Sequence, residues 1–292
     1  MLTSISNKYC KIIADTSGGE LISFEDSHSV HYLHDGNPYF WRFHAPALFP
    51  IIGRFRDGTY TFDGNSYPMT SHGFARTAEF TLIDVSEASI AYELCSNDQF
   101  KAFFPFDFSF IIRYTLHKKT VQTSYHITAT GSDPLYFSVG GHPALACPIG
   151  NGIKFEDYYL EFSEKETIDR YEIDADGFII PEPFSGLDNE NIIHLKYDLF
   201  TNDALIYNGL QSDSITLRCH KSDRAIRFDF PEFPWLGIWT KTNPANTPFI
   251  CLEPWFGHDD FSNAPDELIK KDGIIHLNSK ESFSCTYAIT IL

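Results

Sequence analysis

The sequence predicts an all-β protein, an antiparallel β-sandwich, and three observations indicate this fold class. Apolar and polar residues alternate along several stretches, as they do on a strand that buries one face. Turn signals rich in Asp, Asn and Gly separate these stretches, and no long stretch follows the 3.6-residue period of a helix. Strands that follow one another through short turns, without helices between them, favour antiparallel pairing.

The most regular alternation covers residues 106–130 and predicts a hairpin. Every even position from Phe106 to Leu116 is apolar, and after the polar segment Lys118-Lys119-Thr120 the alternation resumes from Val121 to Ala129. Because so short a polar connection typically joins neighbouring antiparallel strands, we expect residues 106–117 to pair with residues 121–130.

Shorter alternating stretches predict further strands at residues 215–219, 226–230 and 283–291. Two short segments, residues 189–194 and 266–271, are the only helix candidates. The chain has no Ser- or Gly-rich linker, fixed-period repeat or low-complexity tract, so we expect residues 1–292 to form a single domain. The turn signals lie at Asp35-Gly36-Asn37, Asp57-Gly58, Asp63-Gly64-Asn65, Asp176-Gly177 and Asn208-Gly209.

Composition argues against several classes of partner. Lys and Arg number 22 against 39 Asp and Glu, a formal net charge of −17, which disfavours nucleic acids and anionic membranes. The N-terminus lacks the apolar segment typical of a signal peptide, and no run approaches about 18 apolar residues. Six cysteines are present without a CxxC pair. We therefore expect a cytoplasmic protein with reduced thiols, and we leave open whether it forms a homodimer.

Four short polar segments beside Gly or Pro carry the candidate chemistry. They place Arg54, His72, His142 and Glu253 where a chain turns and presents a side chain, and together they supply groups that can move protons on a neutral hydroxylated substrate. His142 follows Gly140-Gly141, which let a backbone approach a ligand closely. Glu253 stands alone among apolar neighbours, so desolvation would raise its pKa toward that of a useful base, unless it only reaches solvent at a strand end.

The other candidates also have a structural interpretation. His72 could simply shape its turn, although Arg76, four residues on, could be aimed at the same ligand. Arg54 could bind a carboxylate inside the protein or a substrate oxygen. Asp203 is similar to the many aspartates that shape a turn, and His142 could be incidental to a glycine bulge. The residues alone leave these alternatives open.

In combination, these segments resemble the aldose 1-epimerase (galactose mutarotase-like) family. The sequences Ala45–Pro50 and Cys251–Trp255 are similar to family motifs, and the resemblance extends from about residue 32 to the C-terminus. The Ser71–Arg76 segment looks like that of a LacX-type and hexose-6-phosphate-type branch. There His-Gly-Phe-Ala-Arg replaces the His-Gly-Gly of galactose-specific members, which puts free galactose in doubt as the substrate. The family order of functional residues is matched by Arg54, His72, His142 and Glu253.

The resemblance implies a large twisted antiparallel β-sandwich, the galactose mutarotase-like supersandwich, with its site in a groove on one sheet. It implies that His142 is the general acid and Glu253 the general base. Arg54 and His72 would hold the sugar ring and its oxygens, and Asp203 would bind sugar hydroxyls. Arg76 would distinguish a phosphorylated from a free sugar, because a dianion calls for a cation.

We therefore expect an aldose 1-epimerase, a mutarotase that interconverts the α and β anomers of a hexose or hexose phosphate by acid/base ring opening. Unperturbed pKa values of about 4.3 for Glu and about 6.5 for His would let a carboxylate and an imidazolium coexist near neutrality. Both groups exchange roles when the ring closes, so we expect neither a metal nor an organic cofactor. The expected partner is a small sugar or sugar phosphate.

Two other functions stay open on the sequence. A carbohydrate-binding or sensing protein could keep the same groove without turnover, and His72, His142 and Glu253 could form a two-His-one-carboxylate metal site. Aromatic rings suit either a sugar-binding face or a core. The tryptophans with these two interpretations are Trp235, Trp239 and Trp255.

Overall fold

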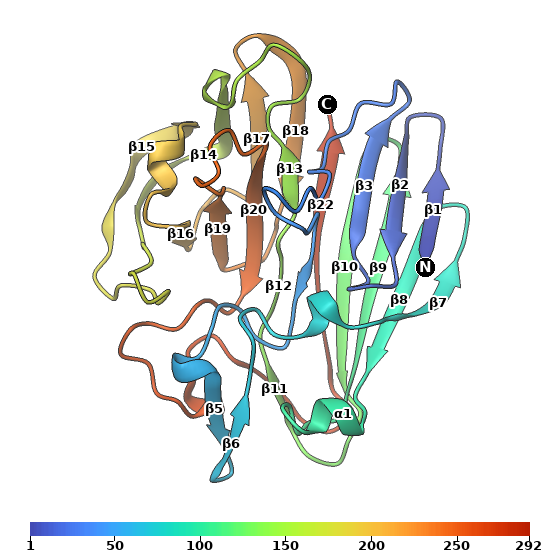
Figure 1. The fold of residues 1–292 in the computed structure, drawn as a ribbon, viewed down its shortest axis with the longest axis vertical. Coiled ribbons are helices and arrows are strands. Elements are labelled where there is room, and N and C mark those ends of the chain that lie inside the picture. The colour runs from blue at the N-terminus through green and yellow to red at the C-terminus, as the bar shows by residue number, and fades with distance from the viewer.

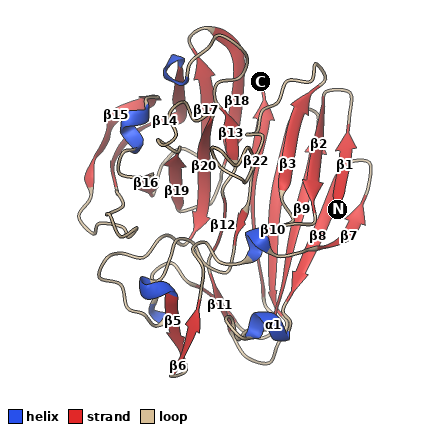
Figure 2. Ribbon diagram, viewed as in Figure 1, coloured by secondary structure: helices blue, strands red, loops and turns tan.

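The computed structural model describes all 292 residues and consists almost entirely of strands and loops (Figure 2). Its one α-helix, α1, is a single turn at Asp98–Lys101. The expected all-β fold class is therefore confirmed. The other helical segments are 3-10 turns at Arg56–Gly58, Ala75–Thr77, Phe155–Asp157, Tyr197–Phe200 and Leu268–Lys270. None of its helices has the length and apolar character that a membrane-spanning helix requires. The six cysteines form no disulfide.

The largest sheet has nine antiparallel strands in the spatial order β15-β14-β17-β18-β22-β10-β9-β8-β7 (Figure 1). It contains the predicted hairpin, in which Thr120 pairs with His117 and the buried residues alternate along both strands. Its strands are β7 (Thr81–Val85), β8 (Ser89–Cys95), β9 (Phe108–His117), β10 (Thr120–Ala129), β14 (Tyr158–Arg170), β15 (Phe184–His194), β17 (Ser214–Cys219), β18 (Ser222–Asp229) and β22 (Ser282–Ile291).

A six-stranded sheet lies over one half of the large sheet, in the order β16-β19-β20-β12-β4, with β13 also paired to β20. Gly141 of β12 packs so closely on Tyr287 of β22 that a Cβ atom at residue 141 would lie 2.6 Å from that ring. The two sheets therefore form the layers of a sandwich. The strands of the smaller one are β4 (Ala47–Leu48), β12 (Val139–Gly141), β13 (Ala144–Ala146), β16 (Leu205–Asn208), β19 (Trp235–Trp239) and β20 (Phe249–Phe256).

Three small sheets complete the fold. The N-terminal sheet lies over the β7–β10 half of the large sheet, where β1 contacts β8 (Figure 1). The main hydrophobic core joins these layers and contains 64 buried residues spread along the chain between Ile5 and Ile291. The small sheets consist of β1 (Leu2–Ser6), β2 (Cys10–Asp15) and β3 (Leu21–Asp26), of β5 (Thr59–Phe62) and β6 (Asn65–Pro68), and of β11 (Leu135–Phe137) and β21 (Ile275–Leu277).

One of the two helix predictions is wrong. Residues 189–194 form the end of β15, where His194 pairs with Tyr159 of β14. Asn189 adopts a φ of 54° at a register shift between these two strands, so a β-bulge interrupts the alternation that would have indicated a strand. The second candidate, residues 266–271, contains the 3-10 turn Leu268–Lys270.

Candidate functional site

A polar cavity of about 240 Å³ opens on the outer side of the six-stranded sheet. The sheet's central strand, β20, is buried along almost its whole length. Ile250 and Leu252 face the main core, whereas Glu253 and Trp255 line the cavity. The structure brings all six candidates from the sequence to this one cavity. They are Arg54, His72, Arg76, His142, Asp203 and Glu253.

Strand register places His142 beside Glu253. Gly140 of β12 pairs with Trp255, whereas Ala144 of β13 pairs with Cys251, so the residues between the two short strands pass next to the middle of β20. The Nε2 atom of His142 lies 3.1 Å from Oε2 of Glu253. His142 is 6% exposed and Glu253 is 2% exposed, so the pair forms the buried end of the cavity.

Three tryptophans surround this pair. The imidazole of His142 lies 4.7 Å from the ring of Trp41 and 5.6 Å from that of Trp239, measured between ring centroids. Trp255 also lines the cavity. Of the three tryptophans proposed from the sequence, Trp239 and Trp255 therefore face the cavity. Trp235 does not line it and instead packs on His258 at 4.3 Å.

Burial shifts both members of the pair toward their uncharged forms. Desolvation, together with the nearby Asp203 and Asp259 carboxyls, raises the pKa of Glu253 well above its usual range. Desolvation, together with the neighbouring His72 and Arg76, lowers the pKa of His142 well below 6.5. Burial thus favours a carboxylic acid facing a neutral imidazole over the carboxylate and imidazolium expected from unperturbed pKa values. Both arrangements hold the same single acidic proton.

His72 is held as a neutral hydrogen-bond donor. The backbone N–H of Gly53 donates to its Nδ1 at 3.1 Å, so the proton of the neutral ring lies on Nε2. Burial, Arg76 and Arg54 lower the pKa of His72 to about 3. The ring therefore offers an N–H donor to the cavity over the whole physiological pH range. His72 itself has a φ of 61°, which turns the chain at this point.

Arginines without a carboxylate partner gather around the cavity. Arg54 and Arg76 form no ion pair with the chain's own acids, and the same holds for the exposed Arg42 nearby. The guanidinium of Arg76 donates to the carbonyl of Ser71 at 2.7 Å, and both Arg42 and Arg76 lie over the ring of Phe43. Arg42 contributes to a lowered pKa of Arg76. In a chain of net charge −17, these cations are free to meet an anion.

Asp203 lies at the mouth of the cavity, with a φ of 69° just after a 3-10 turn. The residue as a whole is exposed, but its carboxyl is crowded by the cavity wall. Desolvation of that carboxyl raises its pKa, and Arg54 partly offsets the effect.

Comparison with known proteins assigns the chain to a family. The family model of aldose 1-epimerase matches residues 1–276. The LacX proteins of Lactococcus lactis, plasmid and chromosomal, are each 33% identical over 300 residues that cover the whole of both chains. The chain belongs to the aldose 1-epimerase family. This membership supports a sugar epimerase role.

Solved structures of galactose mutarotase-like proteins share the fold. A galactose mutarotase related enzyme from Lactobacillus acidophilus superposes with a TM-score of 0.95 at 29% identity, covering 100% of this chain and 97% of that one. A galactose mutarotase-like protein from Lactobacillus casei gives a TM-score of 0.93 at 27% identity over the full length of both. The galactose mutarotase-like sandwich expected from the resemblance is thus confirmed.

Sequence reasoning missed two cavity residues of this family member. Trp41 lies in the aromatic loop Tyr39–Phe43, whose density of rings was the available signal. Asp259 follows Glu253 by six residues and forms, with Asp260, the pair of adjacent acids that ends an apolar stretch. Two adjacent acids that follow an apolar stretch were the sequence signal that could have indicated a further polar part of the cavity wall.

The side chains that could hold a metal ion differ from the set His72, His142 and Glu253 considered from the sequence. Ligand atoms of His142, Cys251 and Glu253 lie within 4.8 Å of one another, and His72 is not part of this group. Burial and the nearby Glu253 raise the pKa of the Cys251 thiol well above its usual range. Since the thiolate is the form that binds metals, a cation at this set would have to displace the proton of the buried thiol.

Proposed function

We propose that the protein is an aldose 1-epimerase that interconverts the α and β anomers of a hexose or hexose phosphate. One observation carries this proposal: a carboxyl and an imidazole, 3.1 Å apart and buried at the end of a polar cavity, that together hold one transferable proton. Anomer exchange needs a proton acceptor at the anomeric hydroxyl and a proton donor at the ring oxygen, two atoms bound to the same carbon.

The reaction conserves the proton of the pair. As the pair donates its proton to the ring oxygen and accepts the one from the anomeric hydroxyl, the bond between C1 and the ring oxygen breaks and an open-chain aldehyde forms. The aldehyde rotates about C1–C2, and the same two transfers run in reverse on its other face. The family resemblance assigns the donor role to His142 and the acceptor role to Glu253.

Burial favours this exchange in a specific way. A neutral acid beside a neutral base avoids the desolvation cost of two charges at rest, and the proton would move from Glu253 to His142 when the polar groups of a bound sugar stabilise the resulting ion pair. The ring of Trp41, tilted by 32° to the imidazole of His142, and the ring of Trp239, nearly perpendicular to it, hold the imidazole in place. The geometry is therefore preorganised for transfer at both sugar oxygens.

The remaining side chains would bind the sugar. His72 would donate its Nε2–H to a sugar oxygen, since its Nδ1 is already occupied by Gly53. Asp203 would accept a hydrogen bond from a hydroxyl at the cavity mouth, and Arg54 would donate to an oxygen beside it. This mixture of donors and acceptors suits a polyhydroxylated ring.

The unpaired cations favour a phosphorylated sugar. Arg76 lines the cavity, Arg42 lies near it, and neither is neutralised by a carboxylate of the chain. Two guanidinium groups without internal partners would be satisfied by a phosphate dianion at one end of the sugar.

An anomer-exchange assay tests the proposal directly. Freshly dissolved α-glucose, α-galactose and their 6-phosphates are followed by polarimetry and by NMR of the anomeric proton, with and without the protein. We expect acceleration with at least one sugar, strongest with a 6-phosphate. Sensitivity to a chelator, with stoichiometric bound metal, would instead support a metalloenzyme. Saturable sugar binding without acceleration would support a carbohydrate-binding protein, and either result would overturn the proposal.

A further inference from the structure

Asp259 is a buried carboxyl that no group of the chain satisfies. It is 6% exposed, lines the cavity together with Asp203 and Glu253, and its carboxylate takes part in no hydrogen bond or ion pair. Neither carboxyl oxygen is among the fully enclosed polar atoms of the chain that lack a partner, so the carboxyl is open to the cavity. A residue of this kind is therefore a candidate for a partner that arrives from outside.

Its neighbour Asp260 provides the contrast. The Asp260 carboxylate forms a buried ion pair with Nζ of Lys271, and its backbone carbonyl accepts from the N–H of Ile179 at 2.8 Å. Asp260 is thus fully used by the fold. Of two adjacent acids with similar burial, one holds the chain together and the other faces the cavity.

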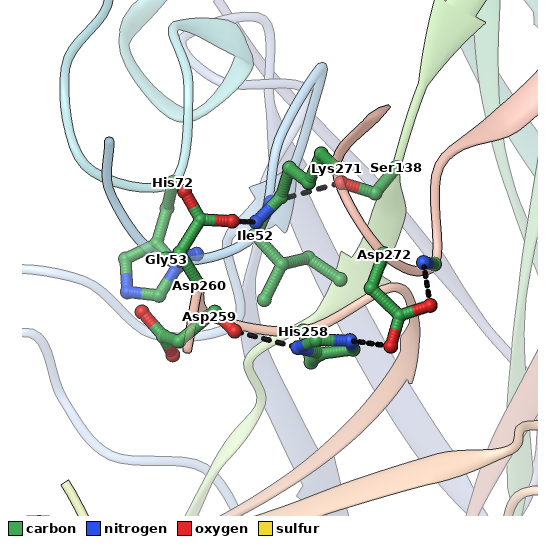
Figure 3. Close-up of polar contacts among 10 residues, drawn as sticks. Ile52, Gly53, His72, Ser138, His258, Asp259, Asp260, Lys271 and Asp272 are labelled. Carbon is green, nitrogen blue, oxygen red and sulfur yellow. Dashed lines mark hydrogen bonds and ion pairs between the residues drawn. The ribbon is translucent and has the colours of Figure 1, made fainter. Parts of the chain in front are cut away.

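The backbone at Asp259 is fixed on both sides. His258 contacts the carbonyl of Asp259 through Nδ1 at 2.5 Å and the carboxylate of Asp272 through Nε2 at 3.3 Å, and Lys271 holds Asp260 from the other side (Figure 3). The ring of Trp235 packs on His258. The segment can therefore hold the Asp259 side chain in one position, as a binding residue requires.

Gly53 makes room for this side chain. It has a φ of 70°, and a Cβ atom at residue 53 would lie 1.8 Å from Oδ1 of Asp259. The same glycine donates its N–H to His72, so one residue without a side chain brings His72 and Asp259 to the same wall of the cavity (Figure 3). The charged groups around the Asp259 carboxyl are Lys271 and Arg54, opposed by Asp203 and Asp260.

We infer that Asp259 is a further substrate-contacting residue, which binds one hydroxyl of the sugar and makes the enzyme selective for substrates that carry it. This inference rests on the proposed sugar substrate. A carboxyl can accept a hydrogen bond when ionised and also donate one when protonated. Burial raises the pKa of Asp259 to about 7, so both forms are available near neutrality. A site built to bond a hydroxyl discriminates strongly against an analogue that lacks it, because its own polar group is then left unpaired.

A deoxy-sugar panel tests the inference. The anomer-exchange kcat/KM is measured for an active hexose and its 2-, 3-, 4- and 6-deoxy analogues with the wild type, Asp259→Ala and Asp259→Asn, and with Asp133→Asn as an exposed control. We expect the wild type to lose about 10-fold or more for one analogue. For the parent sugar, Asp259→Ala should have the same low kcat/KM that the wild type has for the discriminated analogue. For that analogue itself, the variant and the wild type should have equal kcat/KM. Asp259→Asn, of the same shape, guards against misfolding of the alanine variant.

The outcomes separate this inference from the proposed function. A uniform loss across the panel in Asp259→Ala and Asp259→Asn, or no loss, would overturn the role of Asp259 while wild-type turnover upholds the epimerase proposal. If the wild type binds sugars without turnover, the epimerase proposal fails. The same comparison made with dissociation constants then still decides whether Asp259 recognises one hydroxyl.

Discussion

Two buried glutamates lie on the two main sheets and differ in how they are satisfied. Glu166 on β14 of the nine-stranded sheet is 1% exposed and accepts hydrogen bonds from the backbone N–H groups of Gln211 and Ser212, at 3.2 and 2.7 Å. Glu253 on β20 of the six-stranded sheet is 2% exposed, and its close partner is the titratable side chain of His142. The first carboxylate serves the fold, whereas the second retains a group that can exchange a proton.

The same difference extends to the cations of the two regions. Four of the five arginines on the large sheet are paired with acids, as Arg218 is with Glu161 and Arg227 with Asp229, and Arg224 of β18 is the exception. Around the cavity, Arg54 and Arg76 have no acidic partner. Most arginines of the large sheet are thus neutralised within the chain, whereas both arginines that line the cavity are not, which is typical of a binding site.

The largest expected effects come from replacing Glu253 or Glu166 with glutamine. The first replacement should lower activity and the second should lower stability. Glu253→Gln removes the proton acceptor, so we expect anomer-exchange kcat/KM to fall by about 10³-fold, within the usual range for general acid/base groups. Its free energy of unfolding at neutral pH should be unchanged or higher, because the wild-type group is already held as a neutral acid. Polarimetry and urea unfolding measure the two quantities.

Glu166→Gln is the matched control. It weakens two hydrogen bonds to a buried carboxylate, so we expect about 1–3 kcal/mol of lost stability with kcat unchanged. Full activity in Glu253→Gln, or lost activity in a folded Glu166→Gln, would erase the distinction between the two regions.

The pH dependence of stability should report the unsatisfied acid at Asp259. Its pKa of about 7 lies above the unfolded value of about 3.9, so the native state binds the proton more tightly. The stability that this proton contributes is complete below pH ~4 and is lost as pH rises through about 7, by up to about 4 kcal/mol. Asp259→Asn lacks this titration.

Urea unfolding at pH values from 4 to 8 checks this prediction. The free energy of unfolding of Asp259→Asn minus that of the wild type should increase between pH ~4 and ~7 and then stay constant. A difference that is independent of pH would mean that the Asp259 carboxyl titrates as it does in the unfolded chain.

The smallest of these effects should come from the cavity arginine. If the substrate is a hexose 6-phosphate, Arg76→Ala should lower kcat/KM for it by about 10-fold, through the loss of a charge-assisted hydrogen bond, and leave free hexoses nearly unaffected. Arg227→Ala, which removes a paired arginine from the large sheet, should change neither rate. An equal loss on free and phosphorylated sugars would assign Arg76 to the ring instead of the phosphate.

Five strands of the large sheet, β9, β10, β17, β18 and β22, were predictable from sequence, because their buried residues tend to alternate with more exposed ones; β7, with no buried residue, was not. The alternation from Phe108 to His117 and from Ser282 to Ile291 follows directly from that condition. The bulge at Asn189 was not predictable, since it depends on which residues of β14 it meets. Local pattern therefore indicated the strands but not their irregularities.

The site was predictable in part for a different reason. Arg54, His72, His142 and Glu253 were visible as polar residues beside Gly or Pro, and their order resembled a known family. Their meeting at one cavity depends on the register of β12, β13 and β20, which no local pattern encodes. The pKa shifts of the pair and the placement of Asp259 at the cavity depend on burial, so the sequence did not indicate them for the same reason.

The indole of Trp255 packs against two glycines of the six-stranded sheet. Its ring lies flat over backbone, since a Cβ atom at Gly237 or Gly140, its neighbours on the two flanking strands, would come within 2.5 or 2.7 Å of it. A methyl group at either position would have to displace the indole, which lines the cavity. The shape of the cavity beside Trp255 therefore depends on two absent side chains, and under the proposed function a single added carbon there should change the range of sugars accepted without touching an acid, a base or an arginine.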